Sequence, residues 1–162
     1  LYTAQEPAEI AFSSCFPGRI VVRELGPGQS IICQKHAFLC ATYGVELSMF
    51  FQKKLGAGLV GGEGFIMQKV TGPGLVFLEV DGYCQDYDLA PGERLVCDTG
   101  VLAVMDETCS MDVQMVKGVK NMIFGGEGLF DTVITGPGKV HLQTMTIGRL
   151  ARQIIPYIPN KK

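Results

Sequence analysis

The chain of 162 residues is 47% apolar and 19% charged, and its formal net charge is −2. A chain of this size and composition can bury a well-filled core, which excludes an intrinsically disordered protein. The slight negative charge excludes a general attraction to nucleic-acid backbones or anionic lipid. No apolar run approaches the roughly 18 residues of a membrane-spanning helix. The 21 glycines and eight prolines predict many tight turns between short strands.

One stretch of sequence occurs twice, as GGEGFIMQKVTGPGLVFLE at 61–79 and as GGEGLFDTVITGPGKVHLQ at 125–143, with 10 of 19 positions identical. The same offset of 64 residues aligns ELGPGQSIIC at 24–33 with DLAPGERLVC at 88–97. Two separate blocks that share one offset indicate a tandem repeat.

The repeat divides the chain into four parts. Residues 1–15 align with 65–79, so we interpret them as the closing hairpin of a preceding repeat that is mostly missing. Residues 16–79 and 80–143 are the two β-sandwich units, and residues 144–162 form a C-terminal tail.

Apolar residues alternate with period two in GLVFLEV at 74–80, which predicts a strand. Val76 and Leu78 lie on one face and Leu75 and Phe77 on the other, so we expect this strand to be covered on both faces. The outer positions of the equivalent strand in the second unit are polar, which predicts a more hydrated face there. These residues are Lys139, His141 and Gln143.

The two TGPG segments predict turns. Pro73 and Gly74 suit the central positions of a type II turn, because proline presets φ and glycine takes a positive φ without strain. GPG at 26–28, VDG at 80–82 and APG at 90–92 predict further hairpin turns. About six short strands per unit indicate an all-β sandwich or barrel. The structural turn residues of the TGPG segments are Gly72, Pro73, Gly74, Gly136, Pro137 and Gly138.

The tail is the one segment with helical periodicity. Thr146 is the predicted N-cap, apolar residues follow at helical spacing from Ile147, and Pro156 should kink or end the helix near its last turn. The tail is also basic, which favours either contact with a membrane or partner, or packing over a sheet with the cations in water. Its cations are Arg149, Arg152, Lys161 and Lys162.

The sequence resembles the altered-inheritance-of-mitochondria family, whose bacterial members are a domain of unknown function. The resemblance covers essentially the whole chain and is carried by FPGRIV, FQKKLGAGLVGGEG, TGPGLVFLE, LAPGERLVCDTG, KNMIFGGEGLF, ITGPGKVHLQ and RLARQIIPYIP. It implies three fused copies of a double-stranded β-helix-like sandwich similar to the tryptophan RNA-binding attenuation protein, of which this chain lacks nearly all of the first. It also implies a tendency to assemble and no established activity.

Cofactor and metal motifs are weak. GAGLVG, with Gly56, Gly58 and Gly61, matches the dinucleotide fingerprint but is followed by a predicted strand instead of a helix, so we expect no cofactor there. Folds of the double-stranded β-helix type often bind iron or zinc through two histidines and a carboxylate. His36 and His141 are the only two histidines and are far apart in sequence, so we interpret them as exposed or half-buried side chains.

The cysteines follow the repeat. Cys40, Cys84 and Cys109 occupy positions that are aliphatic in the other unit, and Cys33 and Cys97 occupy equivalent positions. This predicts small buried side chains rather than nucleophiles, and the absence of CxxC pairs favours reduced thiols in a cytoplasmic compartment.

Glu63 and Glu127 lie between glycines in both units. Each is expected to bond its own loop, or else to contact a ligand or a neighbouring subunit. No second repeated acid accompanies them, so we identify no catalytic pair. Equivalent lysines are too few to indicate RNA binding, which is supported by fold analogy alone.

The sequence therefore predicts a non-enzymatic binding or scaffold protein without a cofactor, with membrane contact through its tail as a further expectation. Strand edges at the ends of the repeat favour a homo-oligomer with internal pseudo-threefold symmetry. A nucleic-acid or small-ligand binder that uses grooves between repeats, and a metal-dependent enzyme of the β-helix type, are the alternatives.

Overall fold

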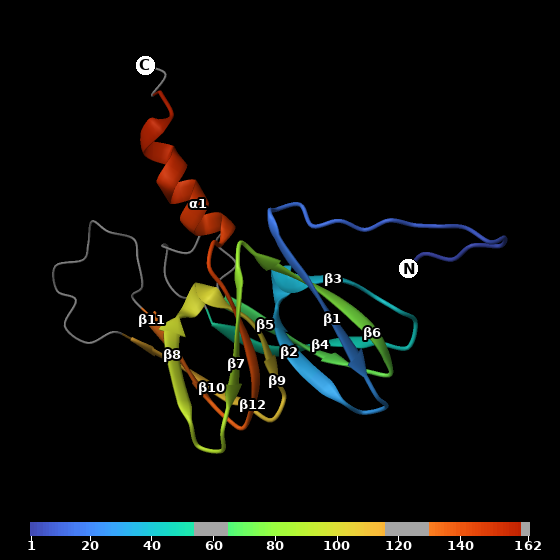
Figure 1. Ribbon diagram of the computed structural model, residues 1–162, viewed down its shortest axis with the longest axis horizontal. Helices are drawn as coiled ribbons and strands as arrows, with labels where there is room; N and C mark the ends of the chain where they lie inside the picture. The colour runs from blue at the N-terminus through green and yellow to red at the C-terminus, as the bar shows by residue number, and fades with distance from the viewer. Residues whose placement is uncertain (54–64, 116–129, 160–162) are drawn as a thin grey trace.

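The computed structural model describes residues 1–53, 65–115 and 130–159. It contains twelve strands in these ranges, short 3-10 turns and one α-helix at the C-terminal end (Figure 1). The prediction of an all-β fold with a short C-terminal helix is confirmed.

The elements of the first unit are β1 (Gly18–Leu25), β2 (Ser30–Gln34), η1 (Lys35–Ala37), β3 (Phe38–Ala41), β4 (Glu46–Lys53), β5 (Phe65–Thr71) and β6 (Gly74–Asp81). Those of the second unit are β7 (Cys84–Leu89), β8 (Arg94–Asp98), η2 (Thr99–Val101), β9 (Leu102–Asp106), β10 (Ser110–Met115), β11 (Phe130–Thr135) and β12 (Gly138–Gln143). They are followed by α1 (Ile147–Ile154) and η3 (Ile155–Tyr157).

The strands of the first unit recur in the second with the offset of the sequence repeat. β2 and β8 differ by 64 residues at both ends, and η1 and η2 follow them with the same shift. The division at 79/80 lies inside β6, which continues to Asp81, so the units are best counted by whole strands.

Three sheets form three layers. The order is β1-β6-β3 in one sheet, β10-β11-β8 in a second, and β4-β5-β2-β9-β12-β7 in the six-stranded sheet that lies between them (Figure 1). The alternating side chains of β2 show the layering. Ile31 and Cys33 pack into the core with Val21 and Leu78 of the first sheet, whereas Ile32 packs into the core on the other side.

The six-stranded sheet joins the two units. Its β4-β5-β2 half belongs to the first unit and its β9-β12-β7 half to the second, and β2 pairs with β9 between them. The register places Ile31 opposite Asp106, Ile32 opposite Met105 and Cys33 opposite Val104. The backbone hydrogen bonds of one sheet thus continue from one unit into the other.

The prediction of hairpins at the glycine-proline turns is wrong. The turn at 26–28 joins β1 to β2, and the TGPG turn at 71–74 joins β5 to β6. β1 and β6 belong to one sheet, whereas β2 and β5 belong to another, so each turn carries the chain from one sheet to the other. The described hairpin pairs are β4–β5 and β10–β11. A sandwich in which consecutive strands belong to different sheets needs such crossings. The residues of a turn do not indicate whether it joins strands of the same sheet or of different sheets.

The TGPG segments are not type II turns. The Gly72–Pro73 and Gly136–Pro137 peptides are cis, and Gly74 has a φ of 146°. Glycine is needed at position 72 because its backbone lies against another turn. A Cβ atom there would lie 2.6 Å from the carbonyl oxygen of Gly26, so the two sheet crossings pack directly against each other.

The faces of β6 and β12 differ from the prediction. Val76 and Leu78 are buried as expected, but the outer residue Leu75 is 37% exposed. On the outer face of β12, Lys139 is exposed as predicted, but His141 and Gln143 are buried. The first unit covers this face, whereas the equivalent face of the first unit lies open.

The two ends of the chain lie off the sheets (Figure 1). Residues 1–17 contain no strand, so the predicted hairpin at 1–15 does not form within this chain. The equivalent residues 65–79 form β5 and β6, which pair with other strands of their unit and not with each other. Thr146 caps α1 by accepting a hydrogen bond from the Arg149 backbone N–H at 3.2 Å, and α1 ends before Pro156, as predicted.

Three of the five cysteines that the repeat comparison predicted to be buried are buried, and two are not fully so. Cys33, Cys84 and Cys109 are buried, Cys40 and Cys97 are half-buried, and Cys15 is exposed. Burial raises the pKa of Cys33 to about 12, from an ordinary value of 9.0.

The raised pKa of Cys33 predicts a loss of stability in alkaline solution. The unfolded chain releases this proton near pH 9 while the folded chain retains it to about pH 12, so the contribution is complete below pH 9 and is lost as the pH rises through that window. Urea unfolding measured across the window should show a slope about 1.4 kcal/mol per pH unit shallower for Cys33→Ala than for the wild type. Cys15→Ala is the control and should keep the wild-type slope; equal slopes for Cys33→Ala would contradict the prediction.

Candidate functional site

Several residues singled out by the sequence lie outside the described ranges. These are Glu63, Glu127, Lys161 and Lys162, together with Gly56, Gly58 and Gly61 of the fingerprint-like segment. Their proposed contacts therefore stay predictions. Of the remaining tail cations, Arg149 forms an ion pair with Asp98 at 3.0 Å, and Arg152 also has an interaction partner.

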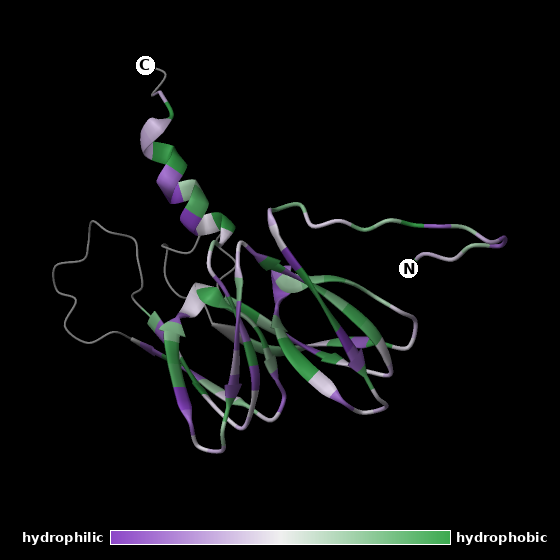
Figure 2. Cartoon of the chain, in the orientation of Figure 1, coloured by the Kyte–Doolittle hydropathy of each residue, from purple (hydrophilic) through white to green (hydrophobic). Residues whose placement is uncertain are grey.

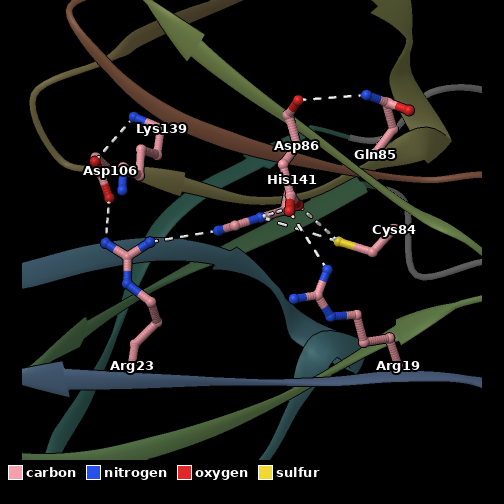
Figure 3. A network of polar contacts seen from close by, with 8 residues as sticks. All are labelled: Arg19, Arg23, Cys84, Gln85, Asp86, Asp106, Lys139 and His141. Atoms are coloured by element: carbon pink, nitrogen blue, oxygen red, sulfur yellow. Dashed lines mark hydrogen bonds and ion pairs between the residues drawn. The ribbon is translucent and has the colours of Figure 1, made fainter.

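The notable concentration of polar side chains in the described structure lies where β1 of the first unit passes over β7, β9 and β12 of the second (Figure 3). We call this group the seam network. It consists of Arg19, Arg23, Cys84, Asp86, Asp106 and His141.

Arg23 forms the centre of the seam network. Its Nη2 lies 2.5 Å from Asp106 Oδ1, and both side chains are mostly shielded, with 23% and 24% of their surface exposed. Asp106 Oδ2 accepts a hydrogen bond from the Lys139 backbone N–H at 2.9 Å. One carboxylate thus connects the first unit, through Arg23, to the edge of β12.

His141 links the ion pair to a second group. Its Nδ1 lies 2.7 Å from Asp86 Oδ1, and its Nε2 lies 3.4 Å from Arg23 Nη1. A guanidinium group can only donate, so Nε2 must accept and Nδ1 carries the proton that is donated to Asp86. The neighbours of the ring therefore assign its tautomer. The same hydrogen bond from His141 is the main cause that lowers the pKa of Asp86.

Cys84 and Arg19 complete the seam network. Cys84 Sγ donates to Asp86 Oδ1 at 3.2 Å, and burial followed by the Asp86 contact raises the pKa of this thiol to about 11. Arg19 Nη1 lies 3.4 Å from Asp86 Oδ2, and both of these side chains are more than half exposed.

Cys84, Asp86 and His141 form a set that suits zinc, with ligand atoms within 4.8 Å of one another. The surroundings fit a cation poorly. A metal on Nδ1 of His141 would displace the proton donated to Asp86 and leave an N–H at Nε2 facing Arg23, which cannot accept it. Arg19 adds a second positive charge beside Asp86. The geometry thus favours a hydrogen-bonded network over a metal centre.

The same three residues do not form a nucleophilic triad. In a triad the histidine lies between the nucleophile and the acid, with one ring nitrogen toward each. Here Cys84 Sγ and Asp86 Oδ1 both approach Nδ1, at 3.9 and 2.7 Å. A thiol with a pKa of about 11 is also a poor source of thiolate.

A pocket of about 490 Å³ opens at one end of the seam, between β1, β2 and the turn that follows β9. Arg23, Glu24, Asp106 and Glu107 contribute its charged lining. Arg23 is paired with Asp106, and Glu107 is paired with Lys69, so these charges connect strands of the two units to each other.

Sequence reasoning identified parts of this site but did not combine them. It noted that His141 replaces Phe77, yet placed the ring on an open face, and it treated Cys84 as an ordinary core position. His36, the other histidine, is exposed in η1. A signal was available, because Arg23 and Asp106 have the uncharged Tyr87 and Thr42 as equivalents. Charged residues whose equivalents in the other unit are uncharged can mark an interface at which these charged residues face one another.

The seam network predicts which cation stabilises the fold. Arg23→Met should lower the free energy of unfolding by about 1–3 kcal/mol, because it leaves Oδ1 of the shielded Asp106 and Nε2 of His141 without their donor. Arg19→Met, on the same strand, is the control and should change it by less than about 0.5 kcal/mol because its ion pair is exposed. Urea denaturation measures both. Equal effects of the two variants would show that Arg23 does not have the stated role.

No similar sequence is found among the curated proteins. A crystal structure of protein SPYM3_0169 from Streptococcus pyogenes superposes with a TM-score of 0.72 and 22% identity, over 89% of this chain and 62% of that one. The likeness shows a shared fold, and the chain spans less than two thirds of that protein. The family model described as Mitochondrial biogenesis AIM24 matches residues 1–145. The chain belongs to the AIM24 family.

Proposed function

We propose that the protein is a non-enzymatic scaffold that assembles by pairing the strand edges of its units. The observation that carries this proposal is the β2–β9 pairing, which joins two units into one sheet. The equivalents of these two strands, β8 and β3, each pair on one side alone among the described strands. Edges of this kind are templates for a further strand.

The chemistry of the seam network supports a structural role. Its histidine, carboxylates and guanidinium groups bond one another across the two units, and its thiol has a raised pKa. The six cysteines are free, which supports a reducing, cytosol-like compartment for the scaffold.

The alternative of a small-ligand or nucleic-acid binder has less support. The pocket at the seam is of a size that suits a small ligand, but three of the four charged residues in its lining are paired within the chain, Arg23 with Asp106 and Glu107 with Lys69. Nucleic-acid binding needs a line of available cations, whereas Arg19, Arg23, Lys69 and Arg149 are each paired with a carboxylate.

The scaffold proposal predicts a particle larger than one chain. Size-exclusion chromatography with light scattering should give at least twice the mass of the chain, falling on dilution. Ile155→Glu, which adds a charge to the tail without touching the sheet edges, should leave this mass unchanged. A constant single-chain mass at every concentration would overturn the proposal.

A second candidate function is contact with a membrane surface through the tail. α1 has no buried residue, points away from the sheets and alternates apolar with polar side chains (Figure 2). Ile147, Ile154 and Ile158 are exposed. Such a helix can lie in the interface of a bilayer. Among the described residues, no helix has the length and apolar character to cross one.

Membrane contact is tested by flotation with phosphatidylserine vesicles. The wild type should float with the vesicles and Ile154→Glu should not, because the substitution places a charge on the apolar side of α1. Met49→Glu alters an apolar side chain on β4 that is more exposed than Ile154, and this variant should float like the wild type. Equal flotation of all three proteins would exclude the tail as the contact.

A further inference from the structure

The two sides of α1 are arranged in the reverse of the usual order. Ile147, Leu150 and Ile154 follow one another at intervals of three and four residues, so they lie on one side of the helix, and we call them the apolar stripe. Arg149 lies on the opposite side and pairs with Asp98 at the end of β8. A surface helix normally turns its apolar side toward the core. Here the polar side is joined to the body, while Ile147 and Ile154 are 62% and 46% exposed.

The start of the tail is attached to the body at a second place. The Thr144 backbone N–H donates to the Tyr83 carbonyl oxygen at 3.1 Å, and the Tyr83 backbone N–H donates to Thr144 Oγ1 at 2.9 Å. These bonds hold the chain that leads into α1 against the turn between β6 and β7. The Arg149–Asp98 pair, at 3.0 Å, then fixes the first turn of α1 to β8. With both attachments, α1 leaves the sheets (Figure 1) with a defined rotation about its own axis.

Asp98 is itself held in place. Its Oδ2 accepts from Arg149 Nη2, and its Oδ1 accepts a hydrogen bond from the Gly100 backbone N–H at 3.0 Å, which caps η2. α1 has no acidic residue in its first turn, so Asp98 supplies the negative charge that stabilises the N-terminal end of a helix. A helix of eight residues is marginal in water without such contacts. Asp98 therefore supports both the formation and the orientation of α1.

We propose that the Asp98–Arg149 ion pair positions α1 so that its apolar stripe meets an anionic bilayer surface. The inference rests on the membrane contact proposed above and adds the residue that orients the helix. A bilayer is the occupant because residues 144–162 contain four cations and no acid, which complements anionic lipid. A helix in the interface keeps its polar side in water, and in this protein the body is joined to that side.

A basic tail can also bind anionic lipid by charge alone, and Asp98→Asn separates the two accounts. The substitution removes a negative charge, so binding by charge alone should become tighter. The amide oxygen of asparagine can still accept the Gly100 N–H, but the charge that holds Arg149 is gone. If the ion pair positions α1, Asp98→Asn should instead weaken binding to phosphatidylserine vesicles about threefold, because the helix is no longer pre-organised.

Three further variants serve as controls. Glu24→Gln removes an exposed carboxylate from β1 and should bind the vesicles at least as tightly as the wild type. Arg149→Gln should weaken binding, whereas Arg149→Lys should retain it, since an ammonium group can still pair with a carboxylate oxygen of Asp98. Asp98→Asn combined with Arg149→Gln should bind no more weakly than Arg149→Gln alone, because both substitutions remove the same ion pair.

Vesicle titration with flotation measures these affinities, and urea unfolding should show wild-type midpoints for all variants if the sheets are intact. Arg149 lies on the tail, so its two variants test the proposal even where Asp98→Asn lowers the midpoint. A wild type that floats, together with an Asp98→Asn protein that binds as tightly or more tightly, would overturn the positioning role and leave membrane contact standing. Equal affinities of Arg149→Gln and Arg149→Lys would do the same. A wild type that does not float would overturn both.

Discussion

The pairing of β2 with β9 is the contact on which the arrangement of the molecule depends. It converts half of each unit into one six-stranded sheet, and this sheet separates two apolar cores. Without the pairing, Ile32 and Met105 would lose the continuous layer in which they are buried. The burial of His141 and Gln143 follows from the same contact, because it places the first unit over their face of β12.

The polar seam beside this pairing has a physical cost and a structural benefit. Enclosed ionic groups stabilise a fold only when every partner is present, and a hydrophobic joint of the same shape could be as stable. A network that includes Arg23, Asp106 and His141 does, however, discriminate between partners, because each charge requires its own counterpart. The exposed Val22 and the half-buried Phe77, which are the equivalents of Asp86 and His141, do not require a charged counterpart. The two units thus combine one selective joint with one apolar surface.

Much of the fold could be predicted because the repeat and the period-two pattern are local signals. The strands, the burial of Val76, Leu78 and Cys33, and the Thr146 cap all follow from residues close in sequence. The sheet crossings could not be predicted, since a glycine-proline turn reads the same whether it joins paired strands or separate sheets. The site also could not be assembled, because Arg23 and His141 are 118 residues apart and meet only after the units join.

Hydrogen exchange of the backbone amides tests the shared sheet most directly. If β2 and β9 form one sheet, their amides should exchange only through global unfolding, as slowly as those of β5 and β12 beside them. The amides of β3 and β8 that face away from their neighbours should exchange much faster in the dilute, dissociated chain. Fast exchange in β2 and β9, comparable to that of β3 and β8, would show that the two units are not joined and would contradict the central claim.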